Sequence, residues 1–305
     1  MPDSPGAASP ATIVDAHAHL LNPAELGYQW IDQRSPALTF LLSNYYDIAR
    51  EFSPADYQNA LAGTGITRVV ACEFGAVDPL AEARWIQHCH DTTGIPGAFI
   101  AAADLTSPRL AELLKQYQDL PVVRAVRQPL YWSENPLTRL GGRPDYVTDR
   151  NWLRGFERVA NSGLVWDLLL YAEQLPLAAP LLRAFPEVPI VLEAAGWPLD
   201  RSPSGFGRWQ DNLLAVSAHP NVSLKLQGLA LIFGPNRESV TLWLTTAVNI
   251  FGPDRCMFAS HLPVDGLLWT CQDLLNTTLH ALAGLDSAGR HSYLAGTAER
   301  IYLAE

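Results

Sequence analysis

Eight short apolar runs, separated by segments of helical periodicity, constrain the fold of this chain more than any other feature. The runs occupy residues 12–19, 67–74, 97–105, 122–128, 164–171, 189–196, 221–228 and 255–262. Between them, segments such as 80–92 and 238–251 repeat apolar residues at the spacing of an amphipathic helix. This alternation predicts an α/β fold in which a parallel sheet closes into a (β/α)8 barrel. An open doubly wound sheet would normally carry a glycine-rich phosphate turn after its first strand, where this chain has "HAHLLNP".

One domain is expected over residues 12–305, preceded by a disordered leader at 1–11. The start, "MPDSPGAASPAT", has neither the basic nor the apolar region of a signal peptide. No linker or shift in composition marks a second domain. The long segments 20–55 and 128–148 are expected to form loops over the mouth of the barrel.

Charge and cysteine content narrow the class of function. A net charge of −10 argues against a nucleic-acid partner or an anionic membrane surface. The four cysteines are scattered without a CxxC pair, which argues against a zinc knuckle or a disulfide framework and favours a reducing cytoplasm. No apolar run has the length of a membrane span. We therefore expect a cytoplasmic protein with a small-molecule substrate, and the sequence leaves open whether it forms a homo-oligomer.

The most pointed motif is "ATIVDAHAHL", in which His17 and His19 stand at the end of the first predicted strand. Residues two apart on a strand share a face, so both imidazoles can point the same way. Active sites of (β/α)8 barrels lie at the carboxyl ends of the strands. The alternative is a pair of histidines that only bond loop backbone. The position on the first of eight strands favours a functional pair.

The segment "IVDAHAHL" resembles the opening motif of the amidohydrolase superfamily, in its amidohydrolase 2 branch. That branch contains (β/α)8-barrel, metal-dependent hydrolases, among them lactonases for fuconolactone, 2-pyrone-4,6-dicarboxylate and muconolactone-type rings. It also contains decarboxylases of the aminocarboxymuconate-semialdehyde type. Further segments carry the resemblance over nearly the whole chain, namely "VVACEFGAVDPLAEARWI", "VVRAVRQPLYW", "LVWDLLLYAEQLP", "HPNVSLKLQGL", "FGPDRCMFASHLPVDGL" and "LAGTAERIY".

The matching positions imply a set of residues that contact substrate. They are Glu73, Arg127, Trp132, Tyr171 and Gln174. Arg127 is the best candidate to hold a substrate carboxylate, because a guanidinium fork matches carboxylate geometry. Two further aromatic residues, Trp30 and Trp197, could wall a flat ring, although each could equally pack under a loop.

Two departures from the family pattern concern the chemistry. Ala194 stands where the family usually has an inward-facing histidine, and strand alternation predicts that Glu193 faces the helices unless a bulge reorients it. His261 stands where the family has an aspartate or asparagine, and an imidazole there could accept a proton from water or bind a metal. Asp265 could orient that imidazole, act as an alternative base, or cap the next helix.

These residues suggest a hydrolase that opens a lactone or a related cyclic ester or amide. His17 and His19 would polarise the carbonyl, and His261 with Asp265 would activate water. The cofactor is either none or a divalent metal, zinc first, held by His17, His19 and His261. No carboxylate is evident at the usual ligand place of the family, which favours an absent or weakly bound metal. The alternatives are a non-oxidative decarboxylase and a catalytically altered barrel used in secondary metabolism.

Overall fold

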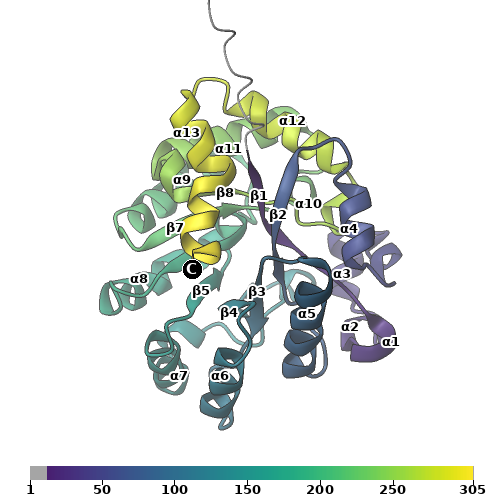
Figure 1. The fold of residues 1–305 in the computed structure, drawn as a ribbon. Coiled ribbons are helices and arrows are strands. Elements are labelled where there is room, and N and C mark those ends of the chain that lie inside the picture. The colour runs from purple at the N-terminus through teal and green to yellow at the C-terminus, as the bar shows by residue number, and fades with distance from the viewer. Residues whose placement is uncertain (1–11, 305) are drawn as a thin grey trace, which may run out of the picture.

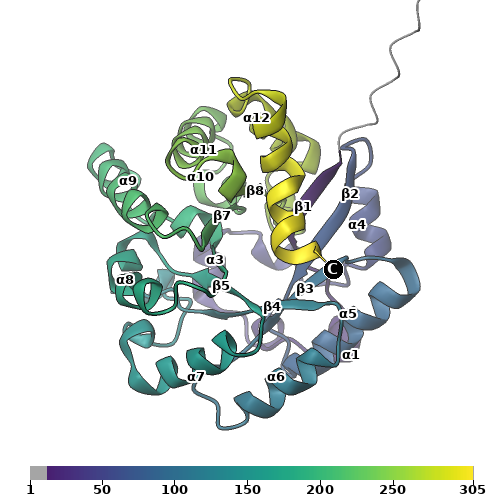
Figure 2. The ribbon, with the colours of Figure 1, turned by 60° about the vertical axis from the view of Figure 1, so that its left-hand side comes forward.

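Eight parallel strands form the centre of the protein, as a computed structural model covering residues 12–304 describes it. The leader expected at 1–11 lies outside the described residues. The strands are β1 (Ile13–Ala18), β2 (Ile66–Cys72), β3 (Ala98–Ala102), β4 (Val123–Pro129), β5 (Val165–Leu169), β6 (Ile190–Leu192), β7 (Val222–Leu226) and β8 (Cys256–Phe258). They neighbour one another in the order of the sequence, and every pair is parallel. All eight predicted strands are therefore confirmed, and Figure 2 shows them surrounded by helices as a (β/α)8 barrel.

Helices cover the outer face of this sheet (Figure 1). The helices of residues 12–304 are α1 (Pro23–Leu26), α2 (Gln29–Asp32), α3 (Pro36–Leu41), α4 (Pro54–Ala60), α5 (Pro79–Thr93), α6 (Leu110–Gln118), α7 (Arg150–Ala160), α8 (Leu175–Ala184), α9 (Pro203–Ser217), α10 (Leu229–Phe233), α11 (Arg237–Phe251), α12 (Cys271–Ala281) and α13 (Ser287–His291). The segment 20–55 was expected to be a loop, but it contains the short helices α1 to α3. Segment 128–148 is irregular apart from the end of β4 and two 3-10 turns.

Local sequence explains where several helices begin. The side chain of Ser53 accepts a hydrogen bond from Asp56 N, and the Asp56 carboxylate accepts one from Ser53 N, so α4 starts with a capping box. Asp149 caps α7 by accepting from the backbone N–H groups of Asn151 and Trp152. None of the helices in the described part of the chain combines the length and hydropathy that a bilayer crossing needs.

Two apolar layers hold the barrel together. Small and branched side chains such as Ala16, Val14 and Ile100 fill its interior, and larger side chains pack between the sheet and the helices. The C-terminal segment closes the end where the strands begin. Its Tyr302 packs with the interior cluster, and its Glu299 pairs with Arg68 near the start of β2. The opposite end, where the strands finish, is left for a site.

The seam between β1 and the segment after β8 brings the two histidine motifs together. His19 N donates to Leu262 O at 2.7 Å, and His261 N donates to His17 O at 2.8 Å. Beneath them, the fully buried carboxylate of Asp15 accepts from Ser260 N at 2.8 Å and from Tyr57 OH at 2.7 Å. Closing the barrel therefore also assembles the candidate site.

Candidate active site

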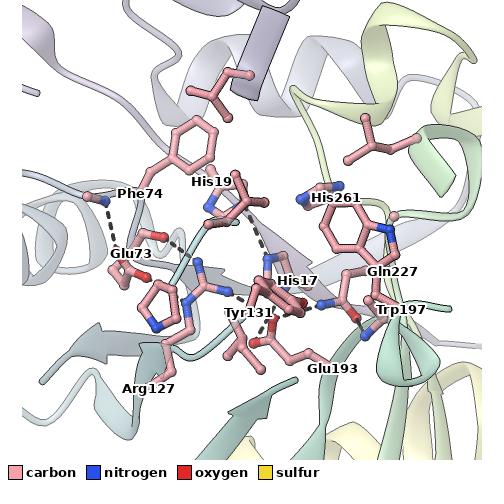
Figure 3. Close-up of a pocket in the computed structure, with 18 of the residues that line it drawn as sticks. His17, His19, Glu73, Phe74, Arg127, Tyr131, Glu193, Trp197, Gln227 and His261 are labelled. Carbon is pink, nitrogen blue, oxygen red and sulfur yellow. Dashed lines mark hydrogen bonds and ion pairs between the residues drawn. The ribbon is translucent and has the colours of Figure 1, made fainter. Parts of the chain in front are cut away.

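A cavity of about 380 Å³ opens at the carboxyl ends of the strands. Most of its lining comes from strand ends and from the loops that follow them (Figure 3). The lining residues are His17, His19, Trp30, Ser35, Leu38, Tyr45, Glu73, Phe74, Gly75, Arg127, Pro129, Tyr131, Arg139, Leu140, Leu169, Glu193, Ala194, Trp197, Gln227, Gly228, Leu231 and His261. The cavity is large enough for a small ring compound.

The three imidazoles expected to act together converge in this cavity. His17 Nε2 lies 3.3 Å from His19 Nε2, and the ring centroid of His261 lies 5.4 Å from that of His17 and 5.3 Å from that of His19. The first two side chains are buried, whereas 14% of the His261 side chain is exposed. His261 also has a positive φ of 56°, an unfavourable backbone conformation for a residue with a Cβ. The backbone at His261 is therefore strained, and this conformation directs the ring into the cavity.

Each imidazole has an oxygen atom behind it, facing Nδ1. His19 Nδ1 lies 3.0 Å from Cys72 O, and a carbonyl oxygen can only accept, so this nitrogen carries the proton. His17 Nδ1 lies 3.6 Å from Glu193 Oε1, and His261 Nδ1 lies 3.6 Å from Asp265 Oδ1. These two contacts are slightly longer than hydrogen bonds, as catalytic contacts often are without substrate. All three partners favour Nδ1–H, which leaves the Nε2 lone pairs to the cavity.

The surroundings keep the buried pair of imidazoles neutral. Burial lowers the pKa of His17 well below its usual value, and the neighbouring His19, Lys225 and Arg127 lower it further. The pKa of His19 is lowered in the same way, by burial first and then by His261 and Arg127. Both are therefore neutral at physiological pH, which is the form that binds metal ions.

Arg127 connects two carboxylates across the floor of the cavity. Its Nε donates to Glu73 Oε1 at 2.6 Å, its Nη1 donates to Glu193 Oε2 at 2.9 Å, and its Nη2 donates to Glu73 O at 2.9 Å. The other Glu73 oxygen accepts from Gly75 N at 2.8 Å. Both residues predicted to contact substrate here are thus at the cavity, but their polar atoms are already engaged with each other.

Glu193 corrects the expectation drawn from strand alternation. Strand β6 ends at Leu192, and Ala194 and Ala195 follow with positive φ values of 52° and 51°. Alternation stops with the strand, so Glu193 points into the site and not toward the helices. Its Oε2 accepts from Gln227 Nε2 at 2.8 Å as well as from Arg127. The exception made above, that a bulge could reorient Glu193, was the available indication in the sequence that this side chain points into the site.

A second ion pair lies directly below. Lys225 is fully buried, and its Nζ lies 2.5 Å from Asp167 Oδ2 and 3.8 Å from Glu193 Oε1. The other oxygen of Asp167 accepts from Tyr302 OH at 2.7 Å. Burial raises the pKa of Glu193 to about 7, although the Arg127 and Lys225 cations act in the opposite direction. Lys225 thus forms a fully buried ion pair with Asp167 beneath the cavity.

Asp265 lies outside the cavity lining and supports His261 from behind. It sits in the 3-10 turn Asp265–Leu267 and is fully buried. Its two oxygens accept from Ala230 N at 3.3 Å and from Leu231 N at 3.0 Å, in the first turn of α10. Its carboxylate therefore caps α10, which precedes it in the sequence, while the same group faces His261.

Aromatic side chains make most of the remaining wall. Phe74 stacks on His19, with ring centroids 4.0 Å apart and planes inclined by 19°. The two tryptophans expected to wall a ring, Trp30 and Trp197, both line the cavity. Trp30 is held by a hydrogen bond from its Nε1 to Phe74 O at 2.8 Å. Phe74, Tyr131 and Gln227 also line the cavity, although the sequence analysis did not single them out.

Three of the residues expected to contact substrate do not line the cavity. The side chain of Gln174 links the segments that follow β4 and β5, because it donates to Leu130 O and accepts from Trp132 N and Tyr171 N. Tyr171 is buried behind Tyr131, with ring centroids 4.7 Å apart. Trp132 carries the guanidinium of Arg139 on its ring face. Each supports the cavity wall from behind.

The residues present fit a divalent metal ion. Two nitrogens bound to one tetrahedral zinc at about 2.0–2.1 Å lie roughly 3.3 Å apart, which agrees with the 3.3 Å between His17 Nε2 and His19 Nε2. Because His19 Nε2 is an acceptor, so close an approach requires a proton or a cation between the two nitrogens. Ala194 offers no ligand. The Cys72 thiol lies within 4.8 Å of both rings, but burial raises its pKa well above the usual value and makes it a poorer ligand.

Comparison with known proteins gives a match over nearly all of the chain. Residues 14–303 match the Amidohydro_2 family, described as amidohydrolase. An uncharacterized protein of Sinorhizobium fredii is 27% identical over 297 residues, which are 96% of this chain and 99% of the relative. L-fucono-1,5-lactonase of Burkholderia ambifaria is 24% identical over 261 residues, 83% of this chain and 81% of the relative.

Solved structures share the fold. An amidohydrolase from Burkholderia multivorans with bound zinc superimposes with a TM-score of 0.80 at 22% identity. The match covers 97% of this chain and 100% of that one.

Proposed function

Because this chain belongs to the amidohydrolase family and is a hydrolase, we propose that it opens a lactone ring by adding water to the ring carbonyl. The observation that carries the proposal is the convergence of three imidazole rings on one cavity at the strand ends. The similarity to curated L-fucono-1,5-lactonases supports a lactone in preference to other hydrolysable groups.

His17 and His19 would hold a divalent metal through Nε2. Members of the amidohydrolase superfamily typically depend on a metal, and these two imidazoles are neutral and fixed from behind. With Nδ1 protonated, the Nε2 atoms carry lone pairs and do not donate to a carbonyl oxygen, so we assign polarisation of the carbonyl to the metal. When bound, the metal supplies a Lewis acid for the carbonyl oxygen and the oxyanion.

His261 is the proposed base. It lies at the more exposed edge of the cluster, and Asp265 faces its Nδ1. Its Nε2 accepts a proton from water as the water oxygen bonds to the carbonyl carbon. When the tetrahedral intermediate collapses, the bond between that carbon and the ring oxygen breaks, and the same proton passes to the leaving alkoxide. The product is an open-chain hydroxy acid.

A panel of γ- and δ-lactones tests the proposal, with proton release as the readout. We expect hydrolysis by the zinc-loaded wild-type protein and a loss of roughly 10²–10⁴-fold in kcat for His261→Ala. His88→Ala is the control, because His88 is exposed on α5 outside the cavity. The proposal is wrong if no lactone is hydrolysed, if His261→Ala retains full activity, or if the protein instead releases CO2 from an aromatic acid.

A further inference from the structure

Two arginines line the cavity, and only one has its charge neutralised by carboxylates. Arg127 contacts Glu73 and Glu193, and Lys225 below it contacts Asp167. An anionic group brought to Arg127 would therefore meet two carboxylates at the same time. A cation at this position cannot attract a substrate anion without first losing one of its own partners.

Arg139 is held in place without being neutralised. Its Nε donates to Ser133 O at 3.1 Å and its Nη2 donates to Glu134 O at 3.2 Å. The guanidinium carbon lies 3.8 Å from the ring centroid of Trp132. Backbone carbonyls and an aromatic face fix the side chain, yet they leave its full positive charge and its Nη1 donors available. Among the described residues, no carboxylate lies within ion-pairing distance of it.

The surroundings of Arg139 strengthen its attraction for an anion. Leu140, Tyr131 and Trp197 line the same cavity and provide apolar and aromatic wall. Electrostatic attraction is stronger next to such surfaces than in open water. The chain as a whole has a net charge of −10, so a local cation is needed to bring a small anion into the cavity.

We propose that Arg139 binds a carboxylate carried by the ring substrate and thereby selects anionic over neutral rings. The proposal deepens the lactone hydrolase function and rests on the same cavity. It moves the carboxylate-binding role from Arg127, where the sequence analysis expected it, to a residue of the loop between β4 and α7. Trp132 becomes the platform that orients this arginine.

The chain contains a matched control four residues further along the same loop. Arg143 also lies over an aromatic ring, at 5.2 Å from the centroid of Tyr146. It differs in being paired with Asp145 at 2.9 Å and Asp149 at 3.0 Å, and it does not line the cavity. Substituting Arg143 therefore perturbs the loop in a similar way without removing a free cation from the site.

The experiment compares two cyclopentanones whose rings contain no hydrolysable bond, 3-oxocyclopentanecarboxylate and its carboxamide, by titration calorimetry. We expect the wild-type protein to bind the carboxylate roughly 10–100 times more tightly than the amide, as a charge-assisted hydrogen bond provides. Arg139→Gln should bring this ratio close to one, Arg139→Lys should leave an intermediate ratio because a point charge remains, and Arg143→Gln should keep the wild-type ratio.

Several outcomes would overturn the proposal. The first is a wild-type protein that binds the carboxylate no more tightly than the amide, or that binds neither ring. The second is an affinity ratio that stays the same in Arg139→Gln. The third is an equal loss of affinity for both rings in Arg139→Gln, which would indicate a structural role. Lactone hydrolysis is measured separately. If carboxylate binding depends on Arg139 but no lactone is hydrolysed, the proposed reaction is refuted and the anion site remains supported. If lactones are hydrolysed without a preference for the carboxylate, the anion site is refuted and the reaction remains supported.

Discussion

Two carboxyl groups face imidazoles across the same distance, but the protein holds them in different ways. Glu193 lies 3.6 Å from His17 and is fixed by the side chains of Arg127 and Gln227, with Lys225 nearby. Asp265 lies 3.6 Å from His261 and is fixed by backbone N–H groups of α10. The first pair depends on a network of buried charges, and the second depends on the fold of one short helix.

This difference suggests a division of labour. A buried carboxyl between two cations is suited to holding a neutral imidazole and a metal ion firmly, because its surroundings cannot rearrange without exposing charge. A carboxylate anchored on backbone, behind a ring that is 14% exposed, leaves that ring free to exchange protons with water. We therefore expect substitutions on the Glu193 side to affect stability and metal affinity, and substitutions on the Asp265 side to affect turnover.

The largest effect should follow from breaking the charge network below Glu193. Lys225→Met leaves Asp167 buried without its cation, which costs about 3–5 kcal/mol of unfolding free energy. The measurement is urea unfolding. Arg237→Met is the control, because the ion pair of Arg237 with Asp273 is exposed and should contribute about 1 kcal/mol or less. If both variants lose the same free energy of unfolding, the buried charge network contributes no more to stability than the surface ion pair, and the distinction between them fails.

A third buried carboxyl, Glu82 on α5, shows what burial does without neighbouring cations in contact. It accepts from Phe74 N at 3.1 Å, and burial together with the nearby Glu73 raises its pKa to about 8, although this hydrogen bond and Arg127 act in the opposite direction. Between the unfolded value near 4.5 and about 8, the folded protein keeps a proton that the unfolded chain releases, so stability falls as pH rises through this window.

Substituting Glu82 by glutamine should remove this contribution. The wild-type protein should lose about 2 kcal/mol relative to Glu82→Gln between pH 6 and 7.5, at roughly 1.4 kcal/mol per pH unit. Urea unfolding of both proteins across this range measures the difference. If the free energies of unfolding of the two proteins change with pH in parallel, Glu82 is ionised in the folded protein and the contrast with Glu193 does not hold.

Glu193→Gln should weaken metal binding while the protein stays folded. The amide keeps the shape of the side chain but loses the negative charge facing His17, and loss of such a supporting carboxylate lowers metal affinity by roughly 10–100-fold. Competition with a zinc chelator measures the affinity. Asp265→Asn serves as the comparison and should bind zinc as the wild type does. Equal zinc affinity in all three proteins would remove the role assigned to Glu193.

The smallest effect is expected from Asp265→Asn on catalysis. The amide still accepts a hydrogen bond from the first turn of α10, so stability should change little, and kcat should fall about 10-fold because His261 loses its orienting charge. Asp265→Ala should additionally lose about 1–2 kcal/mol of stability, since the helix cap is gone. Steady-state kinetics at fixed zinc concentration, with unfolding curves alongside, separates the two effects. An unchanged kcat for Asp265→Asn would show that this carboxylate only caps α10.

The barrel could be predicted from the sequence because each strand is encoded locally. Runs of apolar residues between helical segments specify eight strands, and the ends of parallel strands must meet at one edge. The convergence of His17, His19 and His261 follows from the fold, because the first and last strands of a barrel are neighbours. Irregular backbone could not be predicted in the same way. Glu193 was misplaced because the alternation rule was carried one residue past the end of β6.

The partners of the charged side chains could not be predicted from the sequence either. Nothing local indicates that Arg127 reaches Glu73 and Glu193, which are 54 and 66 residues away in the sequence. The cap that Asp265 places on α10 joins residues 34 and 35 positions apart. Arg139 was not considered at all, because it lies in a loop without periodicity, and its position over Trp132 depends on how that loop folds.

The protonation of the histidine nitrogens tests the central claim most directly. Nitrogen-15 chemical shifts of labelled histidines distinguish protonated from unprotonated ring nitrogens, and single substitutions assign the signals of the eight histidines. In zinc-loaded protein at pH 8, we predict that His17 and His19 are neutral and that His17, His19 and His261 carry a proton on Nδ1. A proton found on Nε2 of His19 or of His261 would contradict it, because the lone pairs needed for metal binding and water activation would then point away from the cavity.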